Sequence, residues 1–211
     1  DGDGGFWLAS EGRTDRLIPH ALYRVTGAGE IVEEIALPDA LLAVERRFGM
    51  EGVTRVDGML YIAIQREWAD DPEGHAKILT YDIAAAEWGV LHYPLEPTET
   101  GWVGLSEITA HDGHLYLIER DNQIGAAARI KQVTRVALEG LAPVPPGETP
   151  QVVEKVVVRD LLPDLRATGG YVLDKVEGLA IRPDGTAWVV TDNDGVDDHS
   201  GETMLFTMPL K

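Results

Sequence analysis

Three similar stretches of this sequence each begin near a glutamate and end in a cluster of charged and polar residues. The stretches are MEGVTRVDGMLYIAIQRE from Met50, SEITAHDGHLYLIERDN from Ser106 and VEGLAIRPDGTAWVVTDND from Val176. Each reads glutamate, apolar run, Asp-Gly, second apolar run and polar cluster. An Asp-Gly pair between two apolar runs predicts a β-hairpin, because both residues accept the positive φ angles of a tight turn.

A hairpin places the start of its first strand beside the end of its second strand, so each glutamate is expected to lie near the polar cluster of its own stretch. The expected groups are Glu51 with Gln65, Arg66 and Glu67; Glu107 with Glu119, Arg120, Asp121 and Asn122; and Glu177 with Asp192, Asn193 and Asp194. A partial fourth copy, DGDGGFWLASEGR, opens the chain and places Glu11 and Arg13 at the equivalent position. If the hairpins surround one axis, the groups gather at a common rim.

Carboxylate and amide oxygens in a chain without cysteine form a ligand set suited to a hard divalent cation, with Ca²⁺ expected first. A cation would also relieve the repulsion between clustered carboxylates. The groups at the hairpin ends are therefore candidate metal ligands, and Asp192, Asp194, Asp197 and Asp198 can converge through a glycine-bearing loop. The densest acidic run, DNDGVDDHSGE from Asp192, lacks the spacing of an EF-hand. The alternative is that each carboxylate forms a structural ion pair or caps backbone amides.

Basic residues stand among these acids, and a cation beside a metal suits a phosphate or carboxylate substrate. We predict catalytic roles for Glu51, Glu107 and Glu177, with Arg66 or Lys175 holding the phosphate. A structural ion pair is the competing interpretation for Arg66 and is favoured for Arg120.

Other catalytic classes lack their motifs. Neither Ser10 nor Ser106 lies in a G-x-S-x-G elbow, and DGDGG has no lysine of a phosphate loop. The histidines are spread without ligand spacing and are interpreted as surface or packing residues. Trp68 and Trp102 fall in predicted loops, where they could face a ligand.

The charge balance restricts the class of partner. Acidic residues outnumber basic ones 36 to 18, which gives a net charge of −18 and argues against binding to nucleic acid or an anionic membrane. No apolar run approaches the length of a membrane span. A small phosphorylated or ester substrate is the expected partner.

The repeats predict an all-β fold, a β-propeller of about four four-stranded blades. A third strand follows each hairpin, and the first three copies add a fourth strand. The approximate blades are residues 1–39, 48–98, 103–163 and 174–211 of a single propeller domain spanning 1–211. The segments REWADDPEGHA, LAPVPPGETP and LLPDLRATGGY are expected to be loop insertions, and Ala40–Phe48 could form two helical turns.

The first copy lacks a first strand and the last copy lacks a fourth strand, so the chain begins and ends inside a blade. We therefore expect part of a larger propeller, of about six blades, because open apolar sheet edges promote aggregation. The remaining blades would come from the same longer chain or from another copy.

Together, DGGFWLASEGR, GMEGVTRVDGMLYIAIQRE, LSEITAHDGHLYLIERDN and DKVEGLAIRPDGTAWVVTDNDGVDD resemble the bacterial phytase-like family, known as esterase-like activity of phytase. The resemblance covers nearly the whole chain. It implies a secreted or periplasmic propeller, additional N-terminal blades and a phosphoester hydrolase. The recurrent acids of the family, which the resemblance implies as the metal ligands, fall at Glu11, Glu51, Glu107, Glu119, Asp121, Glu177, Asp192 and Asp194.

Three functions remain open at this point. The first is a metal-dependent hydrolase of phosphoric esters, in which a metal-bound water attacks phosphorus. The second is a lactonase-like ester hydrolase with one axial metal. The third is a non-catalytic binding propeller that calcium stabilises.

Overall fold

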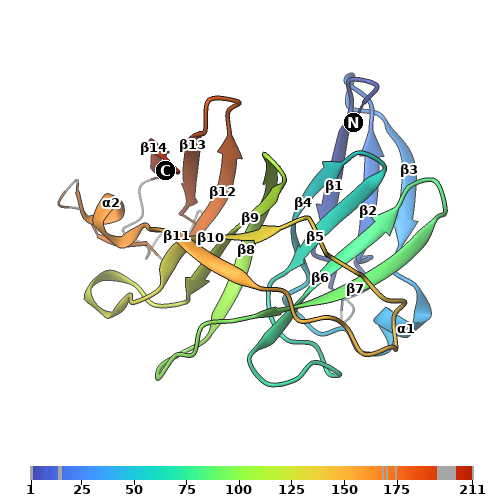
Figure 1. Cartoon of the computed structure of the whole chain (residues 1–211), viewed down its shortest axis with the longest axis horizontal. Coiled ribbons are helices and arrows are strands. Elements are labelled where there is room, and N and C mark those ends of the chain that lie inside the picture. Colours follow the sequence, from blue (N-terminus) through green and yellow to red (C-terminus); the bar gives the residue numbers. More distant parts are fainter. Residues whose placement is uncertain are drawn as a thin grey trace. The chain divides into compact units, whose positions relative to one another are not determined.

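The computed structural model describes residues 2–13, 16–167, 169, 171–173, 175–193 and 203–210. Antiparallel β-sheet is the main regular structure (Figure 1). The chain divides into two compact units. The first unit contains residues up to Pro94 together with Leu141–Val153, and the second contains Leu95–Gly140 and the residues from Glu154 onward. Each unit holds two sheets.

The first unit contains a three-stranded sheet and a four-stranded sheet. The strands are β1 (Phe6–Ser10), β2 (Ala21–Val25) and β3 (Ile31–Ala36), then β4 (Met50–Val56), β5 (Met59–Ile64), β6 (His75–Asp82) and β7 (Glu87–Pro94). Neighbours in sequence are neighbours in each sheet. Leu22 and Ile35 of the smaller sheet share one buried core with Leu60 and Ile62 of the larger sheet. Burial of these aliphatic side chains stabilises the pair of sheets.

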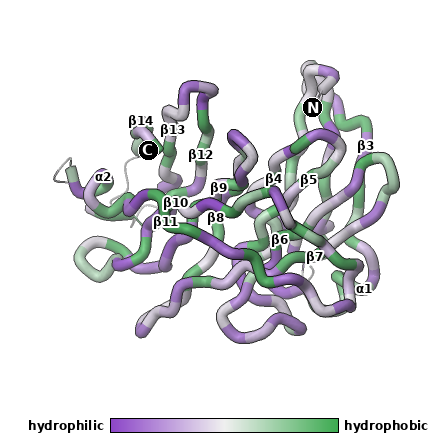
Figure 2. Tube along the Cα trace, in the orientation of Figure 1, coloured by the Kyte–Doolittle hydropathy of each residue, from purple (hydrophilic) through white to green (hydrophobic). Residues whose placement is uncertain are grey.

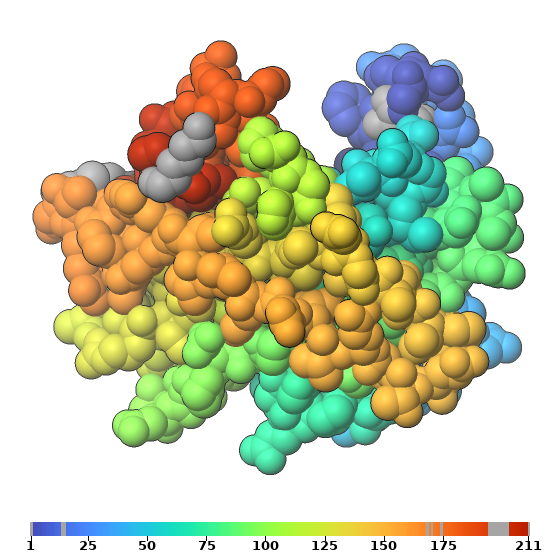
Figure 3. Space-filling model, viewed as in Figure 1, coloured from blue at the N-terminus to red at the C-terminus, as the bar shows by residue number. Residues whose placement is uncertain are grey.

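The segment Leu141–Val153 completes the first unit by pairing with its outermost strand, β7. The amide of Val90 donates to the carbonyl of Val144 at 2.8 Å, and the amide of His92 donates to the carbonyl of Gln151 at 2.9 Å. Figure 3 shows this segment, in yellow to orange, on the surface. LAPVPPGETP contains no helix or strand, as predicted for a loop insertion, and its backbone also covers the open edge of β7.

The second unit repeats the arrangement. Its four-stranded sheet contains β8 (Val103–His111), β9 (His114–Asp121), β10 (Lys131–Ala137) and β11 (Lys155–Asp160), and its three-stranded sheet contains β12 (Lys175–Ile181), β13 (Thr186–Asp192) and β14 (Leu205–Pro209). Ile118 and Val133 pack with Val176 and Val189 in the core between these sheets. Figure 2 shows hydrophobic residues recurring along the strands.

Helices are few and short. The helix α1 (Asp39–Leu42) is one turn, shorter than the two turns considered for Ala40–Phe48. The residues from Ala43 to Phe48 continue as turns and irregular backbone, and Val44 among them packs against the core of the first unit. The helix α2 (Leu162–Arg166) and the 3₁₀ turn η2 (Gly125–Ala127) lie in the second unit. No helix in the described part of the chain is long and apolar enough to span a membrane.

The β8–β9 turn has the geometry that its residues predict. Asp112 and Gly113 have φ angles of 44° and 74°, and His111 pairs with His114 across the turn. Positive φ at both central residues is the requirement of a type I′ hairpin. The turn therefore sets the register that brings the other ends of β8 and β9 together.

A β-bulge near the start of each hairpin displaces one residue from the pairing register. The displaced residues are Glu51 in β4, Ser106 in β8 and Glu177 in β12. In the pairing register, Glu107 therefore corresponds to Gly52 and Gly178 of the other two hairpins. It lies one position later in its strand than Glu51 and Glu177 do in theirs. A bulge re-aims the side chains next to it, so Glu107 and Glu177 leave their strands differently.

The all-β fold class with four antiparallel sheets is confirmed, and within the described residues the first and the last sheet each contain three strands.

Candidate functional site

The second unit brings Glu107 of β8 close enough to Glu177 of β12 for their charges to interact. The Glu107 carboxylate accepts a hydrogen bond from the amide of Ile108, at 2.8 Å, and another from the amide of Leu179. The Glu177 carboxylate accepts one from Nη2 of Arg120, at 2.7 Å. The two sheets of the unit therefore meet at a pair of carboxylates.

Burial changes the protonation of both carboxyl groups. It raises the pKa of Glu107 to about 7, and the negative charge of Glu177 adds to the increase, while the amides of Ile108 and Leu179 oppose it. Burial also raises the pKa of Glu177, against the opposing charges of Arg120 and Lys175. Glu107 therefore exchanges a proton near neutral pH, as general acid–base catalysis requires.

Arg120 holds Glu177 in place. Its side chain is 2% exposed, forms the 2.7 Å ion pair with Glu177, and lies over the Trp102 ring with 5.4 Å between the guanidinium carbon and the ring centroid. A cation on an aromatic face gains electrostatic stabilisation as well as packing. These contacts confirm a structural ion pair for Arg120. Because Arg120 is almost completely buried, we interpret it as a residue that positions Glu177.

Lys175 and Asp192 lie beside the carboxylate pair. They face each other across β12 and β13 in the strand register, and the charges of both act on Glu177. Lys175 is half-buried and Asp192 is exposed. The sequence-based grouping of Glu177 with Asp192 is thus present, with Lys175 as the more accessible cation of the cluster.

Glu119 and Asp121 leave β9 on the face opposite Arg120, because successive side chains of a strand alternate. Glu119 accepts hydrogen bonds from Nζ of Lys155, at 2.9 Å, and from Nε2 of Gln132, also at 2.9 Å. The expectation that both acids gather around Glu107 with Arg120 is wrong for this reason. Both carboxylates are fully buried and already bound by protein donors.

Asp121 lies at the centre of a buried network. It accepts hydrogen bonds from the amides of Arg129, at 2.7 Å, and Ile130, at 2.9 Å, and it pairs with Nζ of Lys131 at 2.9 Å. Burial alone would raise the pKa of Asp121, but these donors hold it below its ordinary value. The network fixes the loop between β9 and β10.

The corresponding residues of the first unit form a looser arrangement. Nε2 of Gln65 donates to the Glu51 carboxylate at 2.6 Å, as the hairpin predicts. Arg66 lies over the Phe48 ring, 4.9 Å from its centroid, and its Nε is 3.8 Å from the Glu67 carboxylate. Glu11 is exposed at the end of β1.

The described residues do not supply a complete set of ligands for a metal ion. Among the residues that the structure describes, no three carboxylate or imidazole side chains lie close enough together to hold a metal. Glu119 and Asp121 are bound to lysines, and Glu107 is bound to backbone amides. Asp194 and the acidic residues after it lie outside the described residues. The described donors alone therefore do not make the predicted calcium site.

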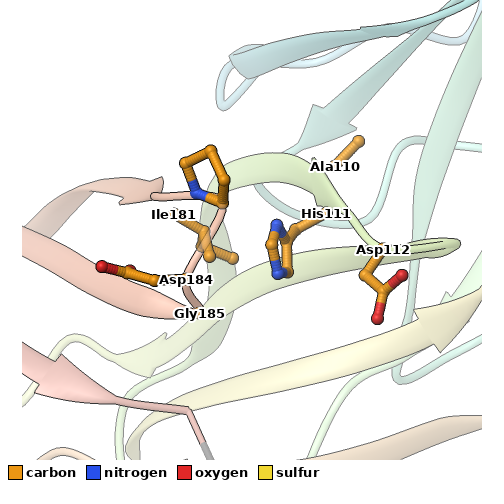
Figure 4. Close-up of a pocket in the computed structure, with 7 residues that line it drawn as sticks. Ala110, His111, Asp112, Ile181, Asp184 and Gly185 are labelled. Atoms are coloured by element: carbon orange, nitrogen blue, oxygen red, sulfur yellow. The ribbon is translucent and has the colours of Figure 1, made fainter.

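A cavity of about 590 Å³ lies at the turn end of the two hairpins in the second unit. His111 and Asp112 line it from the β8–β9 turn, and Ile181 and Asp184 line it from the β12–β13 turn (Figure 4). The Glu107–Glu177 pair lies toward the other end of the same hairpins. The cavity is thus separate from the carboxylate pair.

Sequence reasoning missed a buried charged cluster in the first unit. Nζ of Lys77 pairs with Asp70 at 2.6 Å and with Asp71, and Nε2 of His92 lies 3.0 Å from the Asp71 carboxylate. Trp68, predicted to be available to a ligand, is 2% exposed and packs against Lys77. One signal was present in the sequence, because Lys77 opens the predicted strand KILTYDI directly before Ile78 and Leu79, and a lysine that is buried there needs partners.

The raised pKa of Glu107 predicts how the free energy of unfolding changes with pH. Its pKa is about 7 in the folded chain against an ordinary 4.5, so folding strengthens proton binding. The resulting stabilisation is complete below pH 4.5 and is lost as the pH rises through 7, by up to about 3 kcal/mol. Denaturant unfolding at pH 5 and pH 8 should show this loss in the unmodified chain and not in Glu107→Gln. The same pH dependence in both proteins would contradict the assignment.

No curated protein matches the chain. The family model described as esterase-like activity of phytase matches residues 1–195. The match covers most of the sequence. It includes Glu107, Glu177 and every strand of the four sheets except β14. The chain therefore belongs to the phytase-like family.

Proposed function

We propose that this protein hydrolyses small phosphoric esters at the Glu107–Glu177 cluster of the second unit. The family membership suggests phosphoric ester hydrolysis as the reaction class. The observation that carries the proposal is the Glu107 carboxyl group, whose pKa of about 7 lets it accept and return a proton at neutral pH.

In the proposed reaction, ionised Glu107 takes a proton from a water molecule as the water oxygen attacks phosphorus. The new P–O bond forms while the ester P–O bond breaks. The departing alkoxide takes a proton from the solvent, because it leaves on the side of phosphorus opposite to the attacking water. Glu107 then releases its proton to the solvent, so that an alcohol and a phosphate are the products and the carboxylate is restored.

The neighbouring residues have distinct roles in this proposal. Half-buried Lys175 attracts the phosphate group by charge, as an ammonium does in other phosphate sites. Arg120 orients Glu177, and the negative charge of Glu177 adds to the increase that burial causes in the pKa of Glu107. Glu51 and Arg66, also predicted to be catalytic, lie in the first unit, and their roles stay predictions.

Calcium binding stays a prediction for the whole protein, and no step of the proposed reaction is assigned to the ion. The described donors do not complete a site, and the run that includes Asp194 would have to supply further ligands. The periplasmic or secreted location and the pairing with additional blades also stay predictions that rest on the resemblance.

The reaction class can be tested on the purified full chain. The substrates are p-nitrophenyl phosphate and phytate, against p-nitrophenyl acetate and dihydrocoumarin, each with 1 mM CaCl₂ or with EDTA. We expect phosphate release with kcat/KM rising as the pH increases toward 7 and levelling above it, because the base acts when deprotonated. Turnover of the lactone or acetate without phosphate release would favour the lactonase-like alternative.

A non-catalytic binding role is the second candidate function. It is favoured by the buried pairs of Glu119 with Lys155 and of Asp121 with Lys131, which give these acids a structural use. If no substrate is turned over in either metal condition, and CaCl₂ raises the thermal midpoint, this candidate replaces the hydrolase.

A further inference from the structure

The first unit contains a cavity of about 440 Å³ around the buried Lys77 cluster. Three segments enclose it: α1 and the residues after it, the loop and strands that carry Asp70, Lys77 and His92, and residues 147–150 of the segment that covers β7. This volume lies within the range of small-molecule sites. The cavity is built by parts of the chain that are far apart in sequence.

Lys77 is not available to bind an anion in this cavity. Its side chain is 1% exposed, and its ammonium group is held by Asp70, at 2.6 Å, and by Asp71. The Trp68 ring lies 5.5 Å from its nitrogen. The positive charge is therefore already compensated within the wall of the cavity.

His92 offers an acceptor to the same cavity. The residue is 7% exposed, and burial lowers its pKa, so the ring is neutral at neutral pH. Nε2 lies 3.0 Å from the Asp71 carboxylate and must carry the proton that it donates there. Nδ1 is then a lone-pair acceptor, and no partner for it lies among the described residues.

The remaining wall combines apolar surface with negative charge. Leu41, Val44 and Val90 provide the apolar part. Asp70 and Glu148 also line the cavity, and the Asp70 side chain is 42% exposed. Among the charged side chains that line the cavity, Asp70 and Glu148 are negative and Lys77 is positive. The site is thus rich in acceptors, net negative and partly apolar.

We propose that this cavity binds a small organic ammonium ion. The ammonium N–H groups donate to the Asp70 carboxylate and to Nδ1 of His92, and the apolar body of the ligand packs against Leu41 and Val44. The surplus negative charge disfavours an anion, and the apolar wall favours an amine with a hydrocarbon body over a metal ion or ammonia. The proposal does not depend on the Glu107 site.

Calorimetric titration of the full chain with benzylammonium at pH 7.5 tests the proposal. We expect saturable binding, at least tenfold weaker binding of the uncharged benzyl alcohol, and none of phenylacetate. Equal affinities for benzylammonium and benzyl alcohol, or no saturable binding of benzylammonium, would overturn it.

Substitutions locate the binding. Asp70→Asn should weaken benzylammonium binding by about tenfold and Glu148→Gln by about threefold, since exposed charges contribute less than paired ones. Glu148 lies in an exposed loop, so its substitution leaves the core intact if Asp70→Asn fails to fold. Thr149→Trp, placed in the wall, should abolish binding by filling the cavity.

The matched control is Glu87→Gln, which removes one exposed negative charge from the same unit at the start of β7. It should bind benzylammonium as the unmodified chain does. A loss of affinity in Glu87→Gln equal to that in Glu148→Gln would indicate attraction by the overall negative charge, and would exclude a built site. Full binding by Thr149→Trp would exclude this cavity.

Discussion

Substitution of Glu107 by Gln is expected to lower phosphate release from p-nitrophenyl phosphate at pH 8 by about 10²–10⁴-fold, the range typical of a lost general base. Gln matches the size of Glu, and its carbonyl oxygen can still accept the hydrogen bond from the amide of Ile108. It cannot accept a proton from water. The effect should therefore fall on kcat, with a smaller change in KM.

Two further variants separate catalysis from folding. Glu154→Gln removes an exposed carboxylate from the same unit and should leave kcat unchanged. Glu107→Asp keeps the carboxyl group and should restore part of the rate. If Glu107→Gln retains the full rate while the chain remains folded, Glu107 is not the base, and the reaction must be assigned to another part of the chain.

Substitution of Asp121 by Ala should lower the free energy of unfolding by about 3–5 kcal/mol, because it removes the carboxylate that pairs with the buried ammonium group of Lys131. Both side chains have zero exposure. The backbone amides of Arg129 and Ile130 lose their acceptor in the same change. For a chain of this size, we expect the thermal midpoint to fall by about 10 °C.

The control for this experiment is Glu99→Ala, an exposed substitution expected to change stability by less than about 0.5 kcal/mol. Asp121→Asn keeps one acceptor oxygen and should give an intermediate loss. The same measurements in CaCl₂ test the predicted metal role of Asp121. Equal midpoints for Asp121→Ala and the unmodified chain would contradict the structural role described above.

The repeats made much of the fold predictable, because a blade is a local unit whose strands pair with their neighbours in sequence. The Asp-Gly turn at Asp112 and the buried apolar strands around Leu60 and Leu117 are sufficient to place hairpins. Membership of the phytase-like family, a family of β-propellers, agrees with that interpretation. The pairing of Val144 with Val90 was not predictable, since it depends on an irregular segment far along the chain.

The residue types of the candidate site could be predicted from the sequence. The directions in which their side chains leave the strands could be predicted less well. Glu107, Glu177 and Lys175 were singled out by their positions at hairpin ends, and the structure brings them into one cluster. A strand alternates its side chains between two faces, so Glu119 and Asp121 lie away from Arg120 although they adjoin it in sequence. Periodicity alone cannot specify bulges, and a bulge sets Glu107 out of register with the other two glutamates.

The covering of β7 by Leu141–Val153 has a consequence for synthesis on the ribosome. The first unit is discontinuous, and residues 95–140 of the second unit must be made before its last segment exists. Until residue 153 has emerged, the backbone groups of Val90 and His92 lack the partners that they have in the finished chain. A nascent chain of intermediate length thus carries an open strand edge, and this interval is when the protein is most exposed to mispairing and to capture by chaperones.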